Sequence, residues 1–194
     1  MKTPDRTSLL LHGETYHIYN KAVGNELLFR TEKDYYFFLN KYERFILPYT
    51  EIYSYCLIPN HFHFLLRIKN LDEINKPCDI DRAFANFFIS YSRSYNNAHK
   101  RLGRLFCQPY KRIVVEDEDY LRTLVCYIHR NPIHHGYSDT YKDWKYSSFS
   151  AFQSGKKTKV TTKKVIDYFY SNSDFLEFHD DNKEFNIEDK YLLE

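Results

Sequence analysis

Alternating apolar and polar residues indicate strands at several points along the chain. Residues 15–23 alternate, are rich in Tyr and Ile, and end at a Gly-Asn pair that is typical of a turn. Residues 51–57 and 61–68 form two further strand-like runs, and the Ile-Pro-Asn connection between them suits an antiparallel hairpin. Residues 112–116 predict a fourth, short strand.

The segments between these strands are predicted to form helices. Thr31 is a candidate cap for a helix that runs through Phe45 and stops before Pro48. Residues 79–102 carry core aromatics at helical spacing and end at Gly103. A third helix begins at residues 117–119, with acidic side chains at its positive end. The order β-α-β-β-α-β-α predicts an α+β fold: a ferredoxin-like antiparallel sheet with helices on one face, plus an extra helix.

Composition and length favour one ordered domain. The chain has 194 residues, including 19 Tyr and 16 Phe, with few Gly, Pro or Met. We assign residues 1–152 to the domain and 153–194, basic and then acidic, to a C-terminal extension that is not a separate domain. Its acidic end is expected to form a peripheral helix or a frayed tail. The four dispersed cysteines indicate neither a zinc site nor a disulfide framework. No signal or membrane segment is apparent, so a cytoplasmic protein with no membrane partner is expected.

The net charge of +2 is uninformative, but the basic residues are unevenly placed. Residues 93–112 contain no acidic side chain and interleave basic residues with aromatics, as in a groove that follows a phosphate backbone and stacks bases. A solvated helix face followed by a loop explains the same pattern. The candidate DNA-binding residues are Arg93, Lys100, Arg101, Arg104, Tyr110, Lys111 and Arg112, with Tyr95 as another stacking platform. The lysines in residues 156–164 form a second basic patch, which is either a further nucleic-acid contact or a solvated loop.

Two histidines lie one residue apart in the predicted strand 61–68. Alternation along a strand puts His61 and His63 on one face and Phe62 and Phe64 on the other. Such a pair is a candidate grip for a divalent metal, although a bare His-x-His motif is more often structural.

Tyr127 and Asn131 lie four residues apart on the border of the apolar face of the third helix. Tyr127 is either a nucleophile or a tyrosine that buries its ring and exposes its hydroxyl. Asn131 is either a ligand or a helix-end cap, because Pro132 is expected to place it at or near the helix end.

Five blocks, in order, make the chain resemble the REP-associated tyrosine transposases, relatives of the HUH single-tyrosine insertion-sequence transposases. They are residues 16–21, 59–66, 103–106 with 114–117, 127–132, and the Trp-Lys-Tyr-Ser-Ser-Phe run at 144–149. The resemblance implies that His61 and His63 bind Mg²⁺ or Mn²⁺, that Tyr127 is the nucleophile, and that Asn131 completes the metal site.

The chain departs from this family at several positions. Asn131 stands where the insertion-sequence branch usually has glutamine, so a water molecule or His129 is an alternative third ligand. Pro-Tyr-Lys at 109–111 replaces a Gly-Arg-Tyr run, which leaves the DNA contact there open. His134 and His135 replace an apolar-arginine run and are expected in an exposed loop, with phosphate contact as the alternative.

The activity implied by the resemblance is metal-dependent nicking and rejoining of single-stranded, hairpin-containing DNA through a 5′-phosphotyrosine. A hairpin-binding module without catalysis is the alternative. An RNA-binding ferredoxin-like protein is disfavoured, because no RNP-type motif is present. Relatives include dimers that exchange catalytic helices, so either a homodimer or a protein that acts alone is expected.

Overall fold

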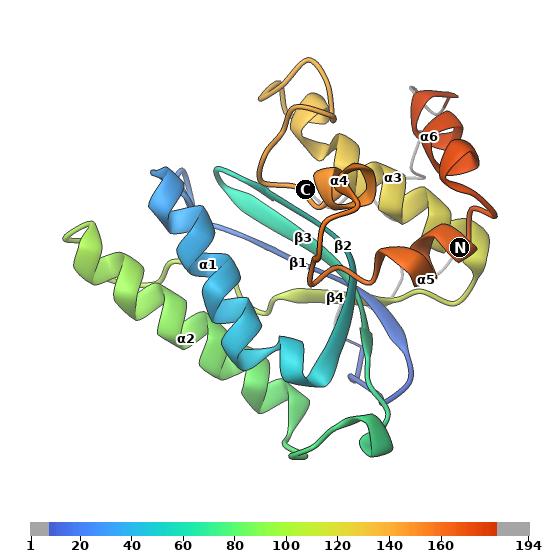
Figure 1. The fold of residues 1–194 in the computed structure, drawn as a ribbon. Helices are drawn as coiled ribbons and strands as arrows, with labels where there is room; N and C mark the ends of the chain where they lie inside the picture. The colour runs from blue at the N-terminus through green and yellow to red at the C-terminus, as the bar shows by residue number, and fades with distance from the viewer. Residues whose placement is uncertain (1–7, 182–194) are drawn as a thin grey trace, which may run out of the picture.

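A computed structural model describes residues 8–181 of the chain. Four antiparallel strands form one sheet: β1 (Thr15–Lys21), β2 (Thr50–Ile58), β3 (His61–Ile68) and β4 (Lys111–Val114). Their spatial order is β2-β3-β1-β4 (Figure 1). With one helix between β1 and β2 and another between β3 and β4, this order is ferredoxin-like, so the predicted α+β fold is confirmed.

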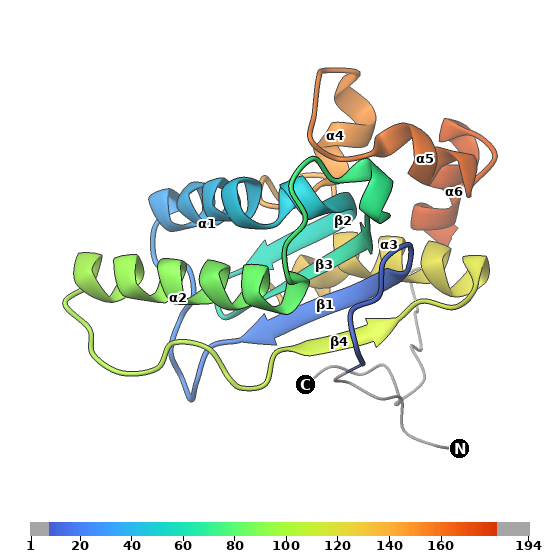
Figure 2. The ribbon, with the colours of Figure 1, turned by 90° about the horizontal axis from the view of Figure 1, so that it is seen from below.

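One face of the sheet is covered by α1 (Glu32–Phe45) and α2 (Ile80–Ala98), which lie side by side in Figure 2. Each begins where a polar side chain caps its first turn: Thr31 forms a capping box with Asp34, and the Asp79 carboxylate accepts from the Arg82 amide. The strand residues on this face are apolar, and the core that they form with the two helices is aromatic. Full burial of one such side chain contributes about 1.5–3 kcal/mol.

The opposite face is covered by α3 (Glu118–His134), so the extra helix encloses the sheet from its other side (Figure 1). Around α3 lie α4 (Phe149–Ser154), α5 (Thr162–Asp167) and α6 (Asn172–Asp181). Leu124 and Ile128 of α3 pack in a second core with Phe149 and Phe175. Residues 153–181 are therefore joined to the domain by buried contacts. The predicted acidic tail residues Glu184, Glu188 and Asp189 lie outside the described residues.

Two predicted helix ends are wrong. α2 ends at Ala98 instead of 102, because Lys100 takes a left-handed φ of 50° and the Arg101 amide turns back to the Asn96 carbonyl. α3 continues through Pro132 to His134 instead of ending near Asn131. Proline costs the helix one amide donor, but the His135 amide still donates to the Asn131 carbonyl at 3.2 Å, and Pro132 itself is buried.

Two short 3₁₀ helices complete the described structure, η1 (Leu47–Tyr49) and η2 (Leu71–Glu73). Among residues 8–181, no helix combines the length and the apolar character that crossing a membrane requires.

Candidate active site

The register of β1 and β3 gathers polar residues on the face that α3 covers. His63 pairs with Tyr19 and His61 pairs with Lys21, so all four side chains lie on this face. Phe62 and the other even-numbered residues of β3 lie in the core on the opposite face. The structure thus places His61 and His63 side by side as the alternation predicts, with ring centroids 5.1 Å apart.

His61 lies between two amide oxygens. Its Nδ1 is 2.9 Å from Asn60 Oδ1, and its Nε2 is 3.0 Å from Asn131 Oδ1. Burial, with a smaller effect of nearby His135, lowers the pKa of His61 to about 3, so the ring is neutral at pH 7. A neutral imidazole has a single N–H and cannot donate to both oxygens.

This arrangement fits a divalent cation. When the N–H of His61 donates to Asn60, the Nε2 lone pair and Asn131 Oδ1 face each other at 3.0 Å. Adjacent ligands of a six-coordinate Mg²⁺ at about 2.1 Å from the ion are also about 3 Å apart. Imidazole and amide ligands do not by themselves choose between Mg²⁺, Mn²⁺ and Zn²⁺. The described residues hold no group of three or more His, Cys, Asp or Glu side chains suited to a metal, so the candidate third ligands are the Asn131 amide oxygen and a water molecule.

His63 forms a hydrogen bond with His17, a residue that the sequence analysis did not single out. His63 Nδ1 is 3.0 Å from His17 Nε2, and both rings are buried. Burial lowers the pKa of His17 to about 3 and that of His63 well below its usual value. In the tautomer in which His63 Nδ1 donates this bond, Nε2 carries a lone pair, and Nε2 makes no hydrogen bond within residues 8–181. His17 therefore occupies the position of an orienting partner for a metal-binding imidazole.

The C-terminal half of α3 brings Tyr127 to this site. Its ring centroid lies 5.7 Å from that of His63 and 5.7 Å from that of His134. Four residues later on the same helix face, Asn131 meets His61, and the His135 ring lies 4.5 Å from that of His61. The predicted loop for His134 and His135 is wrong, since they are the last residue and the C-cap of α3, but His134 is exposed as predicted and His135 is half-buried.

His129 does not join this group. Its Nε2 lies 2.8 Å from Ser148 Oγ and its Nδ1 lies 2.9 Å from His179 Nε2, away from His61. Ser148 Oγ also accepts from the Tyr55 amide at 2.8 Å, so the Trp-Ser-Ser element connects α3 to β2. The alternative of His129 as a third ligand is therefore wrong, and His129 instead fixes the position of the helix that carries Tyr127.

One predicted DNA-binding residue lies beside the histidines. Lys111 pairs with Tyr19 across β1 and β4 and faces a cavity of about 90 Å³. Lys21, His61 and His63 line the same cavity. Two lysines next to neutral imidazoles make this cavity suited to an anionic group such as a phosphate.

The other predicted DNA-binding residues are dispersed. Arg93, Lys100 and Arg104 are exposed. Arg101 forms an ion pair with Glu26 at 3.0 Å. Arg112 alternates with Lys111, faces α2 and pairs with Asp81, and the Tyr110 ring packs on Phe84 at 5.5 Å.

The structure also places Tyr95 and the second basic patch, residues 156–164. Tyr95 is 2% exposed, so it is wrong as a stacking platform. In the second basic patch, Lys159 and Lys164 pair with Glu43 and Glu51, each at 2.7 Å.

We predict that the metal-free protein loses stability as the pH falls below about 6.5. The pKa is lowered to about 3 in His17 and His61 and to about 4 in His179, mainly by burial. Unfolded histidines bind protons below about pH 6.5 and these folded ones do not, so acid favours unfolding by about 2 kcal/mol per histidine at pH 5. Urea unfolding in a chelator, followed by circular dichroism, should show a lower midpoint at pH 5 than at pH 7. An equal or higher midpoint at pH 5 would contradict the neutral buried state.

Two known proteins are similar to this chain, one in sequence and one in fold. No family model matches the chain. It is 28% identical over 103 residues, 51% of its length, to a Haemophilus influenzae protein named "Putative REP-associated tyrosine transposase", and the matched region spans 58% of that relative. A solved structure of a REP-associated tyrosine transposase bound to a REP hairpin superposes with a TM-score of 0.61. That match covers 79% of this chain and 87% of the other at 16% identity, which shows a shared fold.

Proposed function

We propose that this protein nicks and rejoins single-stranded, hairpin-containing DNA through a covalent 5′-phosphotyrosine. The family resemblance supports the proposal, together with the sequence similarity to a relative named as a putative REP-associated tyrosine transposase and the fold shared with a solved transposase. One observation carries the proposal: within a single chain, Tyr127 lies against His63 while Asn131 of the same helix meets His61. A nucleophile and a metal-ligand set are thereby brought together from two elements, β3 and α3.

The chain's own residues account for binding and orientation. Lys21 and Lys111 would bind the non-bridging oxygens of the scissile phosphate, beside the imidazoles of β3. His63 and His134 pack against the Tyr127 ring and limit its orientation. His61, His63 and Asn131 would hold the divalent cation, which when bound neutralises charge on the phosphate and aligns the ester.

The proposed reaction is a transesterification. Tyr127 Oη forms a bond to phosphorus and loses its proton, while the bond to the 3′ oxygen breaks and that oxygen takes up a proton. The products are a 5′-phosphotyrosine and a free 3′-hydroxyl. Attack by another 3′-hydroxyl reverses the step and joins strands without an external energy source. Because Tyr127 meets the histidines of its own chain, we propose that one copy of the protein contains a complete site.

The test is incubation of the protein with a library of labelled stem-loop DNAs and Mn²⁺, followed by denaturing gels. We expect a covalent protein–DNA species that disappears with a chelator. A matched set of stem-loop RNAs tests the choice of nucleic acid. Tight, salt-sensitive binding of hairpins with neither cleavage nor adduct would contradict the proposed reaction and favour a non-catalytic hairpin-binding module.

A further inference from the structure

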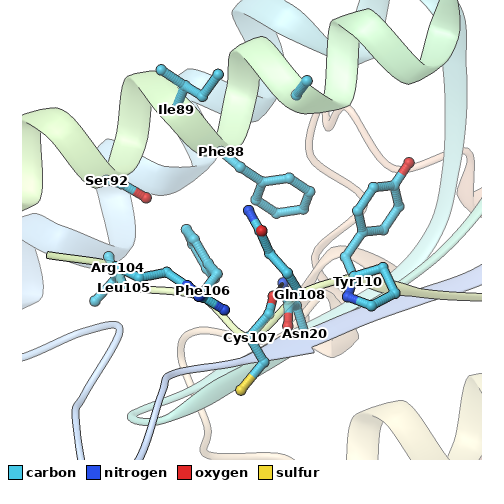
Figure 3. Close-up of a pocket in the computed structure, with 12 residues that line it drawn as sticks. Asn20, Phe88, Ile89, Ser92, Arg104, Leu105, Phe106, Cys107, Gln108 and Tyr110 are labelled. Atoms are coloured by element: carbon cyan, nitrogen blue, oxygen red, sulfur yellow. Dashed lines mark hydrogen bonds between the residues drawn. The ribbon is translucent and has the colours of Figure 1, made fainter.

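A second hollow, of about 840 Å³, lies between α2 and residues 104–110, the segment that leads into β4 (Figure 3). Its volume is in the range of about 300–1,000 Å³ that is usual for small-molecule sites. Three aromatic rings form part of its mainly apolar lining: the Phe88 ring of α2 lies 5.1 Å from that of Phe106 and 5.2 Å from that of Tyr110. Flat apolar walls of this kind suit a planar ring.

Two polar side chains border the hollow and are not used by the fold. In Figure 3, Gln108 points from the 104–110 segment towards Phe88 of α2. Within residues 8–181 the Gln108 carboxamide makes no hydrogen bond, and the exposed Arg104 guanidinium has neither a hydrogen bond nor an ion pair. A free amide can donate to and accept from the edge of a nucleobase, and a free guanidinium can bind a phosphate.

The hollow adjoins the cavity beside the histidines. Asn20, Cys107 and Pro109 line both, so the two spaces are separated by one stretch of chain. Two hydrogen bonds fix that stretch to the end of β1. The backbone amide of Cys107 donates to the Lys21 carbonyl at 2.9 Å, and the side-chain amide of Asn20 donates to the Cys107 carbonyl at 3.0 Å. A group bound at the histidines and a group bound in the hollow would therefore be held as neighbours.

We propose that this hollow binds an unpaired nucleobase of the DNA strand whose phosphate lies at His61 and His63. The inference rests on the proposed DNA function and adds to it a place where a base is held. Three features select this occupant: aromatic walls for stacking, a free Gln108 amide for the base edge, and the free Arg104 cation for the backbone.

Ala85→Trp tests the proposal without removing a core side chain. Ala85 is exposed on α2 and lines the hollow, so an indole there would fill it. Asn86→Trp is the matched control, since Asn86 is the next residue, is exposed and does not line the hollow. The probe is a pool of stem-loop DNAs with a short unpaired tail of random sequence that carries one 5-bromodeoxyuridine; the same stem-loop without a tail is the reference.

We expect Ala85→Trp to bind the tailed DNA about tenfold more weakly than the wild type, the loss of roughly one stacked base. Ala85→Trp should bind the tailless stem-loop as the wild type does. Asn86→Trp should bind both the tailed and the tailless DNA with wild-type affinity. Ultraviolet crosslinking of the wild type should label the peptides that contain Phe88 or Tyr110.

Equal affinity of Ala85→Trp and wild type for the tailed DNA, with crosslinks elsewhere, would overturn the proposal and leave the hollow to another ligand, such as an apolar protein segment. If the wild type still forms the metal-dependent covalent adduct in that case, the proposed function stands although the hollow does not bind a base. Failure of the wild type to bind either stem-loop would overturn both.

Discussion

Tyr127→Phe is expected to abolish the covalent DNA adduct and to reduce strand transfer by about 10³-fold or more. Phenylalanine keeps the ring that packs against His63 and His134 but has no hydroxyl to attack phosphorus. The ring is buried, at 7% exposure, so the fold should be retained. Denaturing gels of the protein with labelled stem-loop DNA and Mn²⁺ measure the loss.

The control for this variant is Tyr120→Phe, which removes a phenolic hydroxyl from the same helix two turns earlier. Tyr120 packs at the edge of the second core and is distant in sequence from the His61 contact of α3. It should form the adduct at the wild-type level. Adduct formation by Tyr127→Phe at a comparable level would show that another residue is the nucleophile.

His61→Ala is expected to weaken Mn²⁺ binding and to reduce nicking by about 10²- to 10³-fold. The substitution removes the Nε2 atom that faces Asn131 at 3.0 Å, and with it one of the two proposed imidazole ligands. Because burial lowers the pKa of His61 to about 3, no buried charge is lost at pH 7, and the fold should persist. Calorimetric titration with Mn²⁺ reports the binding independently of activity.

His12→Ala provides the comparison, since His12 is exposed and its Nδ1 contacts only the Lys69 carbonyl in the described structure. It should bind Mn²⁺ and cleave DNA as the wild type does. Wild-type Mn²⁺ affinity and activity in His61→Ala would exclude the metal site proposed at β3.

Much of the fold follows from local patterns. The Pro59-Asn60 turn and the alternation of Phe62 and Phe64 with histidines were enough to predict the hairpin and the faces of β3. The end of α3 could not be predicted in this way. Pro132 disfavours a helical conformation in the residue before it, and only burial against the domain offsets that local preference.

The site shows the same division between local and long-range information. Strand and helix periods predict that His61 and His63 share one face of β3 and that Tyr127 and Asn131 share one face of α3. That the two pairs meet in one site was implied only by the family resemblance. His17 was missed because its contact with His63 depends on the register between β1 and β3, although alternation along β1 offered a signal. Pairing with β1 also decides that Lys111 faces the histidines while Arg112 faces α2, a distinction that charge along the sequence does not contain.

The most direct test of the proposed function is mass spectrometry of the covalent product formed from stem-loop DNA in the presence of Mn²⁺. After digestion with a protease and a nuclease, the account predicts a single modified peptide that carries a 5′-linked nucleotide on Tyr127. A nucleotide on any other residue, or cleaved DNA with a free 5′-phosphate and no modified peptide, would contradict it.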